Sequence, residues 1–227
     1  MTFYTISKGR AIAVVLPGGP GLLIFENILQ FLGAFVGLSI AVIAIRGYRA
    51  TGSPTLLRLA TAFVFLLGGF AVEGLVGLNT IGFFPQIALI VKLLVSAAAF
   101  LQAAGYFFLF FSHAVNVRVA TRLGIVASLG LPLLSLPGAL QSLSLFFVLY
   151  GSVETAIYYI RMKKTETLVI SIGLGMIALS TFLIWVGYFY PYDPLVLTAA
   201  LIAKVVGFLT LLVPVLKFSF ATEMHLE

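Results

Sequence analysis

Long apolar stretches, separated by short polar turns, run through almost the whole chain. Each stretch is about 18 residues or longer, enough for a helix rising ~1.5 Å per residue to cross ~30 Å of hydrocarbon. The pattern predicts an all-α, polytopic transmembrane helix bundle that forms a single transmembrane domain over residues 1–227. The predicted spans are 22–46, 55–78, 83–112, 119–136, 138–161, 166–190 and 195–220.

The fourth span depends on two prolines. Pro132 and Pro137 interrupt the apolar stretch from Ala120 to Tyr159, and a single helix of that length would overshoot the bilayer. We therefore expect the stretch to divide at Pro137 into two spans, which gives seven crossings. A six-span arrangement is the alternative.

The composition excludes a water-soluble fold. Hydrophobic residues make up 62% of the chain and charged residues 9%, whereas charged residues are about a quarter of an ordinary soluble domain. The chain has no cysteine, which excludes disulfides, thiolate metal sites and thiol catalysis. The lipid bilayer is therefore the first partner that we expect.

Basic residues gather at the ends of the predicted spans, and seven spans would place them all on one side of the membrane. They are Arg46, Arg49, Arg58, Arg118, Arg122, Arg161, Lys163, Lys164 and Lys217. Because cytoplasmic turns are enriched in lysine and arginine, we expect a multi-pass protein of the cell membrane with its amino terminus outside and its carboxyl terminus in the cytoplasm. The net charge of +6 belongs to this pattern, and we expect no nucleic-acid partner.

An internal repeat appears when the chain is compared with itself at an offset of 112 residues. The segment TLLRLATAFVFLLGGF, which begins at Thr55, aligns with TLVISIGLGMIALSTF, which begins at Thr167. IALIVK, which ends at Lys92, aligns with AALIAK, which ends at Lys204. The comparison predicts a 3+1+3 architecture of two parallel three-span units joined by one span. The units are residues 22–112 and 138–220, and the linking span is 119–136.

Polar side chains inside the spans are the candidate functional residues, because a charge at mid-span costs roughly 2.5–3.5 kcal/mol unless it is paired or solvated. The predicted topology places the charged ones in the outer part of the membrane. We predict that they converge in the bundle interior as a cluster of two acids, two amines and an amide. Its members are Glu26, Gln30, Glu73, Lys92 and Lys204. The alternative is that these side chains extend to the lipid headgroups or form purely structural pairs.

The sequence carries none of the common motifs for catalysis or for metal and cofactor binding. Its two histidines, His113 and His225, do not share a span, and it has no P-loop, nucleotide fingerprint, GxSxG or HExxH motif. We therefore expect no enzymatic activity, no catalytic residue, no cofactor and no metal site.

Three short segments in the first half carry a family resemblance. They are RGYRATG from Arg46 to Gly52, AVEGL from Ala71 to Leu75 and AAGYFFLFFS from Ala103 to Ser112. On these segments the chain resembles uncharacterised archaeal multi-spanning membrane proteins, which carry a Tyr-Arg-x-Thr-Gly turn after the first helix. The second half departs from that pattern, with RMKKTET in place of the turn. The resemblance implies a common origin and no particular activity.

Three functions remain open at this point. The lack of a recognisable active site favours an integral membrane protein that serves as an accessory or scaffold subunit of a larger complex, with other membrane protein subunits as partners. A 3+1+3 architecture instead resembles the sugar-transporting SWEET proteins and favours a small-solute transporter whose site lies between the units. The third possibility is a seven-helix membrane sensor.

Overall fold

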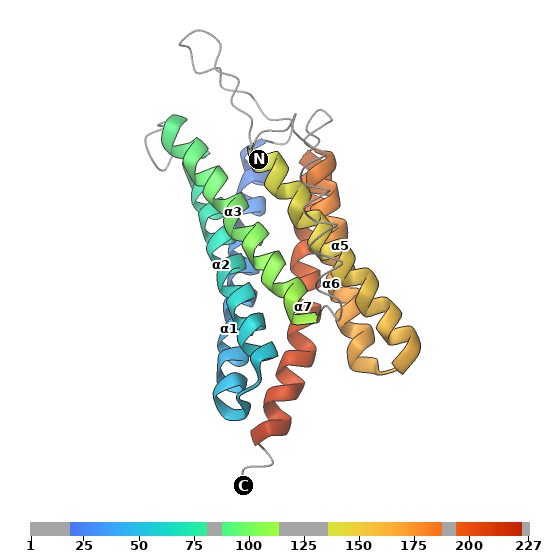
Figure 1. Cartoon of the computed structure of the whole chain (residues 1–227). Helices are drawn as coiled ribbons and strands as arrows, with labels where there is room; N and C mark the ends of the chain where they lie inside the picture. The colour runs from blue at the N-terminus through green and yellow to red at the C-terminus, as the bar shows by residue number, and fades with distance from the viewer. Residues whose placement is uncertain (1–18, 81–87, 114–135, 188–193, 224–227) are drawn as a thin grey trace.

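The chain folds into a bundle of long helices (Figure 1). The computed structural model describes residues 19–80, 88–113, 136–187 and 194–223, which are helical apart from short turns. The helices are α1 (Gly19–Thr51), α2 (Pro54–Thr80), α3 (Ala88–His113), α5 (Leu136–Met162), α6 (Thr165–Val186) and α7 (Pro194–Glu223). All six are long and apolar enough to cross a membrane. The chain is therefore a multi-pass integral membrane protein, as the apolar pattern predicted.

Large apolar side chains cover the outside of the bundle. Phe35, Leu89 and Leu195 are 66%, 67% and 73% exposed, and similar side chains occur on every described helix. Soluble monomers rarely expose continuous apolar surfaces, whereas lipid tails solvate them readily. The exposed faces therefore contact the bilayer.

The predicted spans match the observed helices closely where both are described. For example, the predicted spans 55–78 and 195–220 correspond to α2 and α7, each within a few residues at both ends. The predicted span 119–136 lies outside the described residues, except for Leu136, which begins α5.

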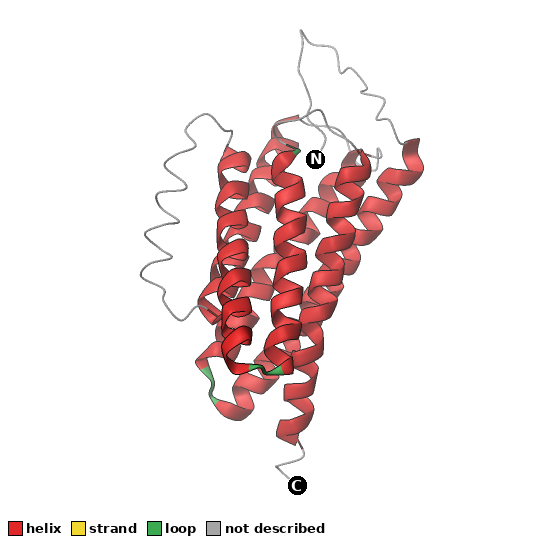
Figure 2. Ribbon diagram, turned by 90° about the vertical axis from the view of Figure 1, so that its right-hand side faces the viewer, coloured by secondary structure: helices red, strands yellow, loops and turns green. Residues whose placement is uncertain are grey.

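Neighbouring helices pack as a closed ring in the order α1, α2, α3, α5, α6, α7 and back to α1. Consecutive described helices are antiparallel except for α3 and α5. Phe107 of α3 contacts Phe147 of α5, and Phe110, one turn later, contacts Tyr150, with ring centroids 5.3 Å apart in each pair. The contacts advance together along both helices, so α3 and α5 are parallel, as Figures 1 and 2 also show. It follows that α1, α3, α5 and α7 share one direction and that α2 and α6 run the opposite way.

Two short links with the same geometry lie at one end of the bundle. Gly52, between α1 and α2, and Lys163, between α5 and α6, have φ angles of 67° and 55°. Each donates its backbone N–H to a carbonyl four residues earlier, that of Tyr48 or Tyr159, at 2.7 Å. We call this end the basic end because of the residues that it carries, and the other the N-terminal end because α1 begins there. The basic residues at the basic end are Arg46, Arg49, Arg58, Arg161, Lys163, Lys164 and Lys217. Arg118 and Arg122 lie outside the described residues.

Glycines determine how closely the helices approach one another. A Cβ atom added to Gly105 of α3 would lie 3.0 Å from the carbonyl oxygen of Ala62 in α2. A Cβ atom added to Gly207 of α7 would lie 2.8 Å from the carbonyl oxygen of Gly173 in α6. Without a strong hydrophobic force between helices in lipid, such close backbone contact is a main source of stability.

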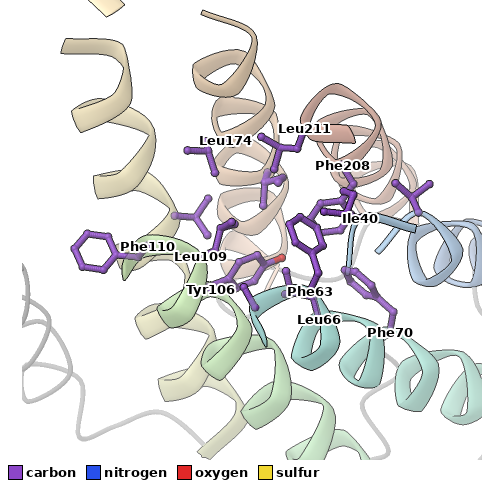
Figure 3. Packing of buried hydrophobic residues seen from close by; sticks show 14 of the residues in the cluster. Ile40, Phe63, Leu66, Phe70, Tyr106, Leu109, Phe110, Leu174, Phe208 and Leu211 are labelled. Atoms are coloured by element: carbon purple, nitrogen blue, oxygen red, sulfur yellow. The ribbon is translucent and has the colours of Figure 1, made fainter. Parts of the chain in front are cut away.

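The middle of the bundle toward the basic end is filled by apolar side chains (Figure 3). Phe208 of α7 packs edge-on against Phe63 and Phe70 of α2, with ring centroids 5.6 and 5.3 Å apart. We call this region the apolar core. Its members include Ile40, Phe63, Leu66, Leu109, Phe110, Leu174, Phe208 and Leu211.

Candidate intramembrane site

Lys204 of α7 is the most informative polar residue in the bundle, because its side chain is only 3% exposed. Burying an ammonium group inside a membrane is costly unless other groups compensate its charge. Part of this compensation comes from Phe70 of α2, whose ring centroid lies 4.9 Å from the Lys204 Nζ atom. Lys204 therefore points into the bundle and not toward the lipid headgroups.

Glu73 of α2 supplies a negative charge near Lys204. The two groups interact electrostatically, but they do not form a direct ion pair like the one between Lys217 and Glu166, at 2.6 Å, elsewhere in the described structure. One carboxylate oxygen of Glu73, Oε2, is buried and has no hydrogen-bond partner among the described residues. Glu73 and Lys204 thus interact without direct contact.

Tyr106 of α3 places a hydroxyl group beside these charges. Its side chain is 1% exposed, and its oxygen points into the middle of the bundle (Figure 3). This hydroxyl lies near Thr181 of α6 and interacts electrostatically with Glu73, yet it forms no hydrogen bond of good geometry within the described part of the chain. We call Glu73, Tyr106, Thr181 and Lys204 the central cluster. Its members come from four different helices.

Further uncharged polar side chains are buried on α3, α5 and α6. Gln102 of α3 and Ser180 of α6 are 3% and 0% exposed. The Nε2 atom of Gln102 and the Oγ atom of Ser180 are buried without hydrogen-bond partners in the described ranges. Gln141 of α5 donates from Nε2 to the backbone carbonyl of Thr181 at 3.4 Å. Because an unsatisfied polar group inside a membrane costs several kcal/mol, these open donors and acceptors indicate a place for water or a polar ligand.

Gln30 of α1 lies at the height of Glu73. The ring of Phe31, the next residue in α1, packs against Gly74, the next residue in α2, which fixes this register. The Oε1 atom of Gln30 is also buried without a hydrogen-bond partner in the described structure. An unsatisfied acceptor on α1, Gln30 Oε1, therefore lies at the same height in the bundle as an unsatisfied carboxylate oxygen on α2, Glu73 Oε2.

Glu26 extends the polar groups toward the N-terminal end. It lies one helical turn before Gln30, is partly buried, and accepts a hydrogen bond from the Thr198 hydroxyl of α7. We call Glu26, Gln30 and Glu73 the polar ladder, because they follow one another from the N-terminal end to the central cluster. The apolar core continues from the central cluster toward the basic end.

Lys92, the remaining member of the predicted cluster, is not brought into this interior. Its side chain is exposed near the start of α3, and its backbone carbonyl accepts a hydrogen bond from the Ser96 hydroxyl at 3.0 Å. Glu26, Gln30, Glu73 and Lys204, by contrast, all lie along the inward-facing polar path.

The burial patterns of α3 and α7 explain this difference between the two lysines. When the sequence of α3 is aligned with that of α7 so that Gln102 matches Lys204, an offset of 102 residues, buried residues of one helix match buried residues of the other. The matching buried pairs are Ala98 and Ala200, Ala99 and Leu201, Gln102 and Lys204, Ala103 and Val205, Gly105 and Gly207, Tyr106 and Phe208, and Leu109 and Leu211. The predicted offset of 112 would instead match the exposed Lys92 with the buried Lys204, so the alignment of the two lysines is not supported.

The sequence analysis did not single out Tyr106, Thr181 or Gln102. None carries a charge, and their helices are apolar on nearly all faces, so no amphipathic stripe marks the inward side. One signal was present in α3, where Gln102 and Tyr106 stand one turn apart beside a row of alanines and a glycine. Small residues on that face indicate close helix contact.

A cavity of about 10 Å³ borders the central cluster between α3, α5 and α6. It is lined by Tyr106 and by apolar residues such as Phe147 and Leu174. Its volume suits about one water molecule. A larger ligand at this point therefore requires the helices to move apart.

The described side chains contain no group of three or more His, Cys, Asp or Glu residues that could hold a metal ion. Comparison of the chain with protein-family models, curated proteins and solved structures finds no significant match.

Proposed function

We propose that this membrane protein transports a small polar solute and that the central cluster is its binding site. The proposal rests on one observation, the burial of Lys204 against Phe70 and within electrostatic reach of Glu73, where helices from both halves of the bundle meet. Charged residues retained inside a membrane bundle typically belong to substrate or ion pathways. The open donors and acceptors around them are those that a polar solute would satisfy.

The arrangement of the helices supports a transporter built from two similar units. The groups α1–α2–α3 and α5–α6–α7 have the same sequence of directions, and the central cluster takes two members from each. Both groups join their first two helices by a link with a left-handed residue, Gly52 or Lys163. Both bring the third helix against the second through a glycine, Gly105 or Gly207. Transporters with parallel repeats, such as the SWEET proteins, bind their substrates between such units.

The parallel packing of α3 and α5 also supports a seventh crossing. Because α3 ends at the basic end and α5 begins at the N-terminal end, residues 114–135 have to join opposite ends of the bundle. The apolar segment 119–136 is suited to that role, which gives a 3+1+3 architecture. The concentration of basic residues favours a cytoplasmic basic end and an N-terminal end outside.

A second candidate function is that of an accessory subunit. It is favoured by the close packing around the central cluster, where the neighbouring cavity has room for only about one water molecule. In a subunit of this kind the polar groups would fix the arrangement of the helices and not bind a solute.

Purification of the full chain from native membranes, followed by solute screening, tests both candidates. A transporter should show a raised melting temperature with a particular class of solute and should carry that solute into proteoliposomes. Replacement of Lys204 by methionine should abolish both effects, whereas replacement of the exposed Lys92 should leave them unchanged. Co-purification of stable partner subunits without any solute effect would reject the transporter and support the accessory role.

A further inference from the structure

The unsatisfied atoms around the central cluster fall into two groups with different chemistry. One group can donate hydrogen bonds and consists of Gln102 Nε2, the Tyr106 hydroxyl and the Ser180 hydroxyl, on α3 and α6. The other can only accept and consists of Glu73 Oε2 and Gln30 Oε1. A single ligand that is only a donor or only an acceptor cannot satisfy both groups.

We propose that the central cluster binds a small anion, such as a monocarboxylate, together with one proton, the anion at Lys204 and the proton on Glu73. The proposal deepens the transport function and rests on it. The anion would accept hydrogen bonds from the donor group. The proton would convert the Glu73 carboxylate into a carboxylic acid, whose new O–H bond would point to Gln30 Oε1.

Charge balance is the physical reason for linking the two ligands. Without ligand, the charges of Lys204 and Glu73 offset each other inside the membrane. If an anion alone entered, the site would hold two negative charges and one positive charge, at a high cost in a medium of low dielectric constant. Protonation of Glu73 removes this excess, because the anion then takes over as the counter-charge of Lys204. Both the empty and the loaded site are neutral.

The polar ladder supplies a route for the proton. Glu26 lies nearest the N-terminal end and is partly exposed, Gln30 follows one turn later, and Glu73 is level with Gln30. Among the described residues, polar groups therefore lie between Glu73 and the N-terminal end, whereas the apolar core lies between Glu73 and the basic end.

Few other ionisable groups face Glu73. From the described parts of the packed helices they are Glu26 of α1, Tyr106 of α3 and Lys204 of α7, while the buried polar side chains of α5 and α6 include the uncharged Gln141, Ser144, Ser180 and Thr181. The exposed Lys92 lies outside this set. A proton taken up with an anion is therefore expected on Glu73.

The test uses the purified full chain in detergent, with lactate and acetate as anionic probes and glucose and ethanolamine as controls. The melting temperature should rise with the anions and not with the controls. Apparent Kd values for lactate should weaken as the pH rises, by up to roughly tenfold per pH unit, because one proton is bound with each anion. A pH-sensitive dye in weak buffer should record the uptake of that proton.

Variants make the test specific. Glu73→Gln mimics the protonated acid and should bind lactate with a Kd independent of pH and without proton uptake. Lys204→Met should not bind lactate, and Lys92→Met should behave as the wild type. Binding by the wild type without pH dependence, or pH dependence that persists in Glu73→Gln, would overturn the proposal.

The controls separate this proposal from the transport function. Stabilisation and uptake of glucose without an effect of the anions would leave a transporter but reject proton-linked anion binding. If none of the four solutes raised the melting temperature, proton-linked anion binding would be rejected, and the wider solute screen would decide the transport function.

Discussion

The ammonium of Lys204 lies against the face of Phe70, with 4.9 Å between Nζ and the ring centroid. An aromatic face therefore contacts the buried cation on the side of α2 that also carries Glu73. We expect Phe70→Leu to lower the free energy of unfolding by about 2 kcal/mol, because a desolvated cation–π contact is lost. Chemical unfolding in mixed micelles measures this change. Phe35→Leu, at a position 66% exposed to lipid, is the matched control and should have little effect.

The charges of Glu73 and Lys204 should be energetically coupled. Lys204→Met leaves a buried carboxylate without its counter-charge and should cost about 3 kcal/mol of stability. The double variant Glu73→Gln, Lys204→Met removes both charges, so it should be more stable than Lys204→Met alone. A double-mutant cycle on melting curves measures the coupling. Strictly additive effects would show that the two side chains act independently.

Gly207 should not tolerate a larger residue. The Cβ atom of Gly207→Ala would lie 2.8 Å from the Gly173 carbonyl and 2.6 Å from a side-chain carbon of Ile177. Separation of α6 from α7 should then destabilise the bundle by about 1–3 kcal/mol. The control is Gly21→Ala, because a Cβ atom at Gly21 meets nothing within 4 Å. Equal melting temperatures for the two variants would contradict the close helix contact.

Single introduced cysteines can show whether the chain crosses the membrane an odd or an even number of times, because the natural chain has no cysteine. Seven crossings place Arg49, at the end of α1, and Lys164, at the start of α6, on the same side of the membrane. Arg49→Cys and Lys164→Cys should then react with an impermeant maleimide from that side only, and Leu195→Cys should react from the other. Labelling of Arg49→Cys and Lys164→Cys from opposite sides would reject the seventh crossing.

The sequence predicted the helices well because crossing a bilayer imposes a length and an apolar composition that each span shows on its own. The inward faces were harder to predict. The stripe of Lys92, Ser96, Ala99 and Ala103 follows one side of α3, but only Ala99 and Ala103 are buried, while Lys92 lies beyond the close contacts at the start of the helix. The spacing of residues along a helix therefore does not show how far along one side of that helix the burial extends.

The acidic and amide members of the site could be predicted because polar groups are rare and costly in apolar spans. Glu26, Gln30 and Glu73 follow the inward path that the sequence indicated. Tyr106 and Thr181 could not be found in this way, since both residue types are common at uncharged positions of membrane helices. Their role depends on contacts between α3 and α6, which are distant in the chain.

The apolar core gives the two faces of the membrane unequal access to the central cluster. A molecule entering from the N-terminal end follows carboxylate and amide groups as far as Glu73. From the basic end, the same molecule would first have to displace the rings of Phe63 and Phe208, which meet edge to face. Exchange at the N-terminal end should consequently be the fast half of any cycle, and smaller side chains at these two positions should convert the sealed side into a leak.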